Sequence, residues 1–163
     1  MNYLEGLRKY IGHRPLLMVG ATVLILDNEN RLLLLKRVDN EAWGPPGGAV
    51  EPVELVEEAA RRETLEETGL VLGELVLFNV FSGPEQYYCY PNGDEVYNIT
   101  IVYLCHDTFE KVQLSEEHTE WRYFPLNDIP TPLSPPIVPI IKKFEENFCL
   151  SEVRKTSKTK KQL

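Results

Sequence analysis

One predicted helix changes from apolar to acidic halfway along the face that should pack against the rest of the chain. At 3.6 residues per turn this stripe begins with Val56, Ala59 and Ala60 and continues with Glu63 and Glu67. A helix of a folded domain buries such a stripe, and an unpaired carboxylate is costly to bury. The acidic half of the stripe therefore needs a compensating positive charge.

Glu66 lies at the edge of the same stripe, three residues after Glu63. Like charges at this spacing repel by about 0.2–0.5 kcal/mol per exposed pair, and by more when water is excluded. Carboxylate oxygens are the ligands that Mg²⁺ and Mn²⁺ prefer in proteins. The three carboxylates therefore predict a site for a divalent cation. The outer face has two Glu-before-Arg pairs at i, i+4, Glu57–Arg61 and Glu58–Arg62, which we interpret as structural surface pairs.

The segment before this helix is a predicted tight turn. The run Pro45-Pro46-Gly47-Gly48 cannot form a regular helix or a central strand, and its glycines allow the backbone to approach a ligand closely. We expect the helix to extend over roughly residues 52 to 68, from the Glu51-Pro52 pair to a stop at Gly69.

Turn and helix together fit the spacing G-x5-E-x7-R-E-x2-E-E-x-G-apolar, which is met by Gly48, Glu54, Arg62, Glu63, Glu66, Glu67, Gly69 and Leu70. This pattern resembles the signature of the Nudix (MutT-like) hydrolase family. Two positions depart from the family's usual residues. Thr64 replaces an aliphatic residue, and Val53 stands where a glycine often precedes the first glutamate. Neither departure removes a candidate ligand.

The resemblance implies an α/β fold, the Nudix α/β/α sandwich with a mixed sheet between helices. We expect a short N-terminal segment over residues 1–13, the Nudix domain over 14–148, and a basic, disordered tail over 149–163. A composition of 43% hydrophobic residues over 163 residues suffices for one substantial core.

Residues typical of turns mark the ends of the strands that we expect before and after the predicted helix. We expect residues 16–26 and 31–37 to form a hairpin, and residues 86–90 and 95–105 to form another around an Asn92-Gly93 turn. A further strand is expected over 121–126. A helix carrying Ile137, Ile140, Ile141 and Phe144 should follow Ser134-Pro135-Pro136.

By resemblance, the family's activity is metal-dependent hydrolysis of the pyrophosphate bond of a nucleoside diphosphate linked to another group. That group could be a sugar, a second nucleoside, ribose, or the phosphate of a modified nucleoside triphosphate. Glu66 and Glu67 match the main ligands of Mg²⁺ or Mn²⁺, Glu63 matches a residue that binds metal or orients water, and Gly48 matches a backbone contact. Arg62 is expected to orient Glu63 or its neighbours.

The resemblance leaves the general base open. Together with Glu63 and Glu67 of the helix, Glu117 is a candidate catalytic residue, because it lies in the only later acidic loop that directly precedes a strand; Glu120 is the second choice in that loop. A solvated loop is the competing interpretation. We expect His118 to face solvent.

The substrate contacts predicted outside the helix are Arg37, Trp43 and Tyr88. An aromatic ring of this group, or of the neighbouring Tyr87 and Tyr90, could stack on a base, although packing in the core is the alternative for each of them. By resemblance, Tyr87 and Tyr88 lie at about the distance past the motif where a tyrosine marks the family's diadenosine-polyphosphate hydrolases, and Pro84 lies near, but not on, the proline that marks its ADP-ribose hydrolases.

A net charge of −8 argues against nucleic acid as a partner, because binding a phosphate backbone relies on basic surface. No segment predicts a membrane span or a secretion signal, so we expect a cytoplasmic protein with a small-molecule substrate; a homodimer is left open. Two other functions compete with hydrolysis. One is a Nudix module that binds nucleotide without cleaving it, and the other is an allylic diphosphate isomerase, for which Cys89 or Cys105 would have to lie beside the site.

Overall fold

The computed structural model describes residues 3–159 of the chain, with side chains described up to residue 148. The helices are α1 (Tyr3–Ile11), α2 (Val56–Thr68) and α3 (Val138–Thr159), with 3₁₀ turns η1 (Pro84–Gln86) and η2 (Pro135–Ile137). The strands are β1 (Leu16–Ile25), β2 (Leu32–Arg37), β3 (Trp43–Gly44), β4 (Gly47–Ala49), β5 (Val71–Leu72), β6 (Val76–Phe81), β7 (Tyr87–Cys89), β8 (Glu95–Cys105), β9 (Thr108–Phe109) and β10 (His118–Phe124).

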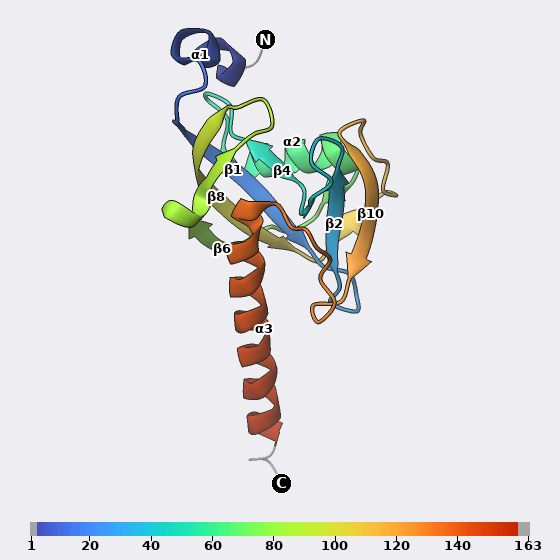
Figure 1. The fold of residues 1–163 in the computed structure, drawn as a ribbon. Helices are drawn as coiled ribbons and strands as arrows, with labels where there is room; N and C mark the ends of the chain where they lie inside the picture. The colour runs from blue at the N-terminus through green and yellow to red at the C-terminus, as the bar shows by residue number, and fades with distance from the viewer. Residues whose placement is uncertain (1–2, 160–163) are drawn as a thin grey trace.

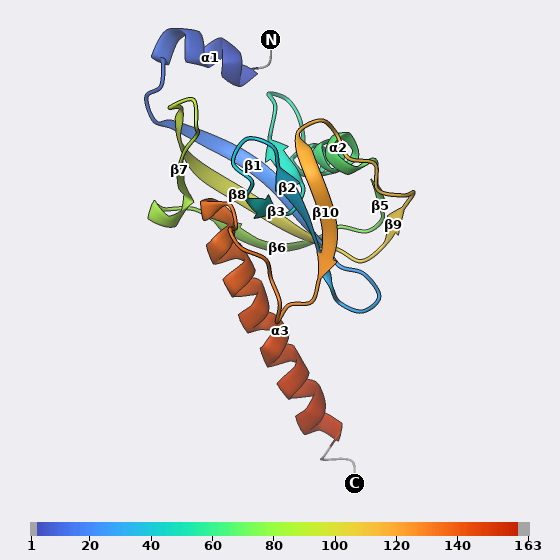
Figure 2. The same ribbon diagram turned by 45° about the vertical axis from the view of Figure 1, so that its right-hand side comes forward.

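The main sheet is mixed and has the strand order β4-β1-β8-β6, with β7 also paired to β8 (Figure 1). Strands β1 and β8 run parallel from Leu16 opposite Val96 to Ile25 opposite Cys105, and the other pairings in this sheet are antiparallel. A second sheet has the order β10-β2-β3 and packs beside the first, as Figure 2 shows. Strands β5 and β9 form a short separate pair.

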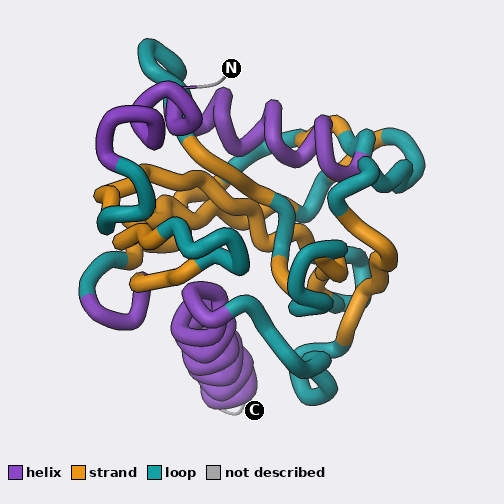
Figure 3. The backbone as a smooth tube through the Cα atoms, turned by 45° about the horizontal axis from the view of Figure 1, so that its top comes forward, coloured by secondary structure: helices purple, strands orange, loops and turns teal. Residues whose placement is uncertain are grey.

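Helices α2 and α3 lie on either side of the strands (Figure 3). An apolar core lies under each of these helices and holds the layers together. Ala59 and Ala60 of α2 pack with Ala21, Val23 and Ile25, whose side chains alternate to one face of β1. The α3 core lies on the opposite face of the sheet, where Ile140, Ile141 and Phe144 pack with Leu24, Leu26 and Val102. Burying one such aliphatic side chain contributes about 1.5–3 kcal/mol. The predicted fold class, a mixed sheet between helices, is confirmed.

The predicted hairpin between residues 16–26 and 31–37 is wrong. Strand β1 pairs with β4 and β8, whereas β2 pairs with β10 and β3, and only an isolated bridge between Leu26 and Leu32 joins them. Strand β2 contributes to both cores. Leu33 and Leu35 belong to the α2 core, and Leu32 and Leu34 belong to the α3 core. Its backbone pairs with β10 and β3 instead of with β1, a long-range pairing for which the turn after β1 carries no signal.

The second predicted hairpin is confirmed, with Cys89 of β7 opposite Glu95 of β8. Gly93 in its turn has φ 86°, a left-handed conformation that glycine adopts without a steric penalty. The strand expected over 121–126 begins earlier, at His118, and ends at Phe124.

Helix α2 begins at Val56, four residues later than the predicted start at 52, because residues 51–54 form a turn instead. Val53 has φ 62° in this turn, which is the conformation that the glycine usual at this position would accept easily. The predicted stop is correct. Gly69 adopts φ 70°, and its N–H donates to the carbonyl of Leu65 at 2.8 Å.

The N-terminal helix α1 lies against the end of the main sheet, and α3 extends away from the domain on the opposite side (Figure 1). The segment predicted as a tail, 149–163, overlaps the end of α3; residues 160–163 and all side chains of this segment lie outside the described residues. None of the described helices is both long and apolar enough to cross a membrane.

Candidate active site

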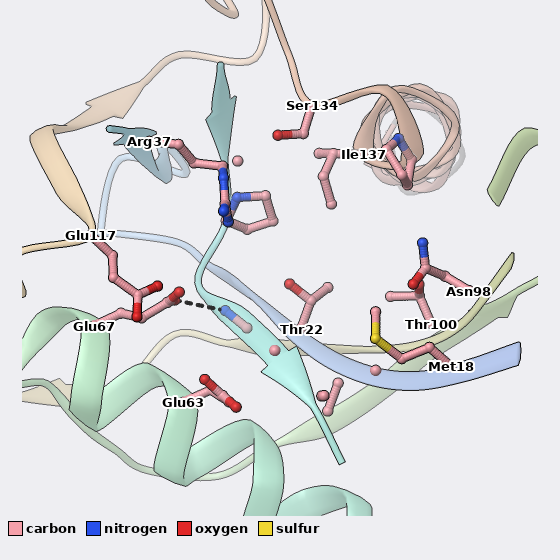
Figure 4. Close-up of a pocket in the computed structure, with 18 of the residues that line it drawn as sticks. Met18, Thr22, Arg37, Glu63, Glu67, Asn98, Thr100, Glu117, Ser134 and Ile137 are labelled. Atoms are coloured by element: carbon pink, nitrogen blue, oxygen red, sulfur yellow. Dashed lines mark hydrogen bonds between the residues drawn. The ribbon is translucent and has the colours of Figure 1, made fainter. Parts of the chain in front are cut away.

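A cavity of about 620 Å³ opens between the main sheet, the second sheet and the start of α3 (Figure 4). Its floor is the face of β1 and β8 that carries Met18, Thr22, Asn98 and Thr100. Carboxylates of α2 and of the loop before β10 form one wall. At the other end lie the start of α3, the Tyr88–Tyr90 segment and Leu4 of α1.

Two glycines let the α2 carboxylates reach this cavity past the edge strand β4. The N–H of Gly47 donates to Oε2 of Glu67 at 2.9 Å. A Cβ atom on Gly48 would overlap the carboxylate of Glu63, so no larger residue fits there unless Glu63 moves. Glu117 approaches the same wall from the loop before β10, as Figure 4 shows. Three carboxylates from two elements therefore face one space.

Arg62 holds part of this acidic wall in position. Its guanidinium donates to Glu54 at 2.7 and 3.0 Å, to Glu63 at 2.7 Å and to the carbonyl of Ala49 at 3.0 Å. A longer contact of 3.3 Å reaches the exposed Glu66. The geometry agrees with the expectation that Arg62 orients Glu63. The predicted surface pair with Glu58 is wrong, because Arg62 turns inward, whereas Glu57 and Arg61 do pair at 2.9 Å.

The protonation of the wall reflects its burial and crowding. Burial, together with the negative charges of Glu63 and Glu117, raises the pKa of Glu67 to about 8, although the Gly47 N–H favours the ionised form. Burial also raises the pKa of Glu63 above its ordinary value, against the opposing effect of Arg62. Both carboxylates are thus destabilised in their charged form when no cation is present.

This environment fits a hard divalent cation, which would remove the repulsion and which takes oxygen ligands. Among the described residues, no three His, Cys, Asp or Glu side chains already converge as a complete metal site. Glu66 points to Arg62 rather than to its neighbours, so a rotation of its exposed side chain would have to complete the ligand set.

The structure brings together most of the sequence-predicted site residues. Gly48, Glu63, Glu66, Glu67 and Glu117 all line the cavity. The second choice for the base, Glu120, is exposed and lies 4.0 Å from the amino group of Lys36, outside the cavity lining.

The predicted substrate contacts divide into two groups. Arg37 and Tyr88 line the cavity, where Arg37 is held by two hydrogen bonds of 2.8 and 2.9 Å to Asp39, and the Tyr88 hydroxyl accepts a hydrogen bond of 2.8 Å from Asn40. Trp43 is only 8% exposed and packs edge-on against Phe124 in the α3 core. The substrate contact predicted for Trp43 is therefore wrong, and the alternative of core packing holds.

Sequence reasoning missed several cavity residues. His118 is buried rather than solvent-facing; its Nε2 lies 3.8 Å from Glu67, and its buried Nδ1 has no hydrogen-bond partner among the described residues. Burial lowers the pKa of this imidazole. Asn98 and Thr100 were not identified either, since single polar residues in a strand carry no spacing signal. The available clue was that both lie at every second position of β8 with the buried Val96 and Val102, on the same face of the strand.

Comparison with known proteins agrees with this fold. The sequence matches the NUDIX domain family over residues 16–147, so the chain belongs to the Nudix family, as the resemblance implied. It is 36% identical over 109 residues to the ADP-ribose pyrophosphatase of Methanocaldococcus jannaschii, covering 65% of this chain and 61% of that protein. It is 32% identical over 114 residues to the nucleoside triphosphatase NudI of Escherichia coli, covering 64% of this chain and 80% of that protein.

The fold is also similar to the crystal structure of a MutT Nudix hydrolase from Burkholderia pseudomallei. The TM-score is 0.63 at 32% identity, over 73% of this chain and 91% of that one. The chain spans less than two thirds of two curated relatives, 61% of the archaeal protein and 44% of a Bacillus subtilis protein. The named relatives hydrolyse different compounds, so the family membership does not identify a substrate.

Proposed function

We propose that this chain is a divalent-metal-dependent pyrophosphohydrolase that cleaves the diphosphate of a nucleoside diphosphate joined to another group. The observation that carries the proposal is the convergence of Glu63, Glu67 and Glu117 on one wall of a large cavity, with Gly48 leaving room for Glu63 and the N–H of Gly47 donating to Glu67. Burial and repulsion at this wall favour a cation, and the cation in turn attracts a diphosphate.

Mg²⁺ or Mn²⁺ would be held by oxygen atoms of Glu63, Glu66 and Glu67, with a backbone contact near Gly48. The bound ion would polarise the diphosphate and lower the pKa of a coordinated water. Arg62 keeps Glu63 oriented toward the cavity through their 2.7 Å hydrogen bond. Because Glu66 is exposed, it can exchange its 3.3 Å contact with Arg62 for a ligand position at little cost.

Glu117 is the first candidate for the general base. It faces the same space as the α2 carboxylates but comes from a different element, so it can accept a proton from water without giving up a ligand position on α2. Glu63 is the second candidate. It lies in the same wall but is bound to Arg62, which favours a ligand or orienting role.

The relatives support two substrate classes, ADP-ribose and nucleoside triphosphates. The cavity extends from the acidic wall along β1 and β8, which leaves space for a nucleoside beyond the diphosphate. The isomerase alternative loses support, because Cys105 is buried in the α2 core and neither it nor Cys89 lines the cavity. The non-catalytic alternative is disfavoured because the carboxylates of the motif are all present.

A turnover assay over a panel of substrates tests the proposal. The panel contains ADP-ribose, the nucleoside triphosphates, a dinucleoside polyphosphate and a nucleotide sugar, each with Mg²⁺, with Mn²⁺ and with a chelator. We expect cleavage of at least one compound, and only when a divalent ion is present. Tight binding of nucleotides and metal without cleavage of any compound would instead support the non-catalytic module.

A further inference from the structure

At the end of the cavity opposite the acidic wall lie polar side chains that have no role in the proposed hydrolysis. Asn98 and Thr100 project from β8, and Ser134 lines the cavity from the loop before α3 (Figure 4). Met18 and Ile137 line the same end and supply apolar surface. Asn98 is only 8% exposed, so its amide lost most of its contact with bulk water when the chain folded. It nevertheless lies at the cavity and not in the apolar core.

The Asn98 amide has a defined orientation. Its Nδ2 donates a hydrogen bond of 3.0 Å to the backbone carbonyl of Gln86, and only the nitrogen of an amide can donate. This bond leaves Oδ1 as an acceptor and the second N–H as a donor. Among the described residues, no other group bonds to either of them.

Gln86 is itself buried and held by hydrogen bonds at both ends of its side-chain amide. It is 1% exposed, its side-chain nitrogen donates to the carbonyl of Pro136 at 2.8 Å, and its side-chain oxygen accepts from the Thr100 hydroxyl at 2.9 Å. These bonds connect β8 to the turn at the start of α3. The Asn98 amide is therefore pre-organised, and a ligand would not have to order it.

An acceptor and a donor side by side match the edge of a nucleobase, as when an asparagine pairs with the N6 amino group and N7 of adenine. The apolar side chains of Met18 and Ile137 suit the flat faces of a base better than the hydroxyl-covered surface of a sugar. This end also lies away from the carboxylates that would bind the diphosphate (Figure 4).

We propose that Asn98 recognises the edge of the substrate's nucleobase, and that the base lies against Met18 and Ile137 while the diphosphate lies at the acidic wall. This proposal rests on the proposed function. It makes Asn98 the residue that determines specificity for the nucleobase of the substrate. A substrate of this site must then carry a base, which excludes inorganic polyphosphates and isoprenoid diphosphates.

Binding of reaction products tests this assignment without turnover. Calorimetric titrations with Mg²⁺ compare AMP, GMP, CMP and UMP with ribose 5-phosphate, which carries the same phosphate and sugar but no base. We expect at least one mononucleotide to bind about tenfold or more tightly than ribose 5-phosphate. The substitution Asn98→Ala should remove most of this advantage and leave the affinity for ribose 5-phosphate unchanged. Asn127→Ala, in an exposed turn, is the matched control and should bind as the wild type does.

Three results would overturn the assignment. They are equal affinity of the wild type for mononucleotides and ribose 5-phosphate, an unchanged preference in Asn98→Ala, and an equal loss of both ligands in that variant. If Asn98→Ala does not fold, NMR of the wild-type protein tests the assignment through the side-chain amide resonances of Asn98. They should shift on addition of the preferred mononucleotide and not on addition of ribose 5-phosphate; identical responses would contradict the assignment. Base-dependent binding in a protein that cleaves nothing would refute the proposed function alone.

Discussion

The acidic wall depends on the glycine at position 48 as much as on its carboxylates. Gly48 leaves the space that Glu63 fills, and a Cβ atom there would overlap the Glu63 carboxylate. We expect Gly48→Ala to displace Glu63, to weaken Mg²⁺ binding and to lower turnover, while the fold stays intact. Gly6→Ala is the control, because nothing lies within 4 Å of a Cβ atom at that position. Titration calorimetry that finds wild-type Mg²⁺ affinity in Gly48→Ala would show that Glu63 is not a ligand.

A second prediction at the residue scale separates the two candidates for the base. If Glu117 accepts the proton of water, Glu117→Gln should lower kcat by about a hundredfold or more and leave metal affinity and KM nearly unchanged, because a base acts in the transition state. Glu63→Gln should instead weaken metal binding. The reverse pattern would make Glu63 the base, and weaker metal binding in both variants would exclude both residues from that role.

Single residues also show where the sequence is informative. The carboxylates of α2 were identified because several of them recur at fixed helical spacing. Trp43 and His118 were assigned incorrectly and Asn98 was not identified, because each is one residue near or in a strand and its direction depends on which sheet the strand joins. Trp43 faces the α3 core, whereas Asn98 and His118 face the cavity.

Among the elements, α1 closes the end of the cavity, to which it contributes Leu4. Arg8 anchors this helix by donating to the carbonyls of Gly12, Arg14 and Glu95 at 3.0, 2.7 and 2.7 Å, and it lies 3.6 Å from Asp94. We expect Arg8→Ala to loosen α1 and to raise KM several-fold with little change in kcat, because the acidic wall is unaffected. Lys9→Ala, at an exposed position of α1, is the control in steady-state kinetics. Unchanged KM in Arg8→Ala would mean that α1 does not contribute to substrate binding.

Strand pairing was the part of the fold least predictable from local sequence. The β7–β8 hairpin follows from its Asn-Gly turn, whereas the parallel pairing of β1 with β8 joins segments far apart in the chain and has no local signal. The four leucines of β2 gave the available hint, since a continuous apolar run predicts a strand that is buried on both faces.

For the whole molecule, the raised pKa of Glu67 makes the stability of the metal-free protein depend on pH. Its folded-state pKa of about 8 exceeds the ordinary value of 4.5, so the folded state binds the proton more tightly than the unfolded state does. The contribution of protonated Glu67 to the free energy of unfolding is therefore fully present below about pH 4.5 and is lost as pH rises toward 8. We expect the free energy of unfolding in chelator to fall by at least about 1.4 kcal/mol over this range, and Glu67→Gln to flatten the dependence.

Urea denaturation at several pH values, in chelator, measures this dependence. The raised pKa of Glu63 acts in the same direction, so a small slope should remain in Glu67→Gln. Equal slopes in the wild type and the variant would contradict the burial argument for Glu67.

The central claim is that the carboxylates of α2 form the metal site of a pyrophosphohydrolase, and the most direct test combines turnover with metal binding in Glu66→Gln and Glu67→Gln. Each substitution removes a ligand charge and little volume. With the best substrate of the panel and saturating Mg²⁺, we expect turnover to fall by about a hundredfold or more in each variant, with weaker Mg²⁺ binding and an unchanged circular dichroism spectrum. Wild-type turnover and metal affinity in both variants would contradict the claim.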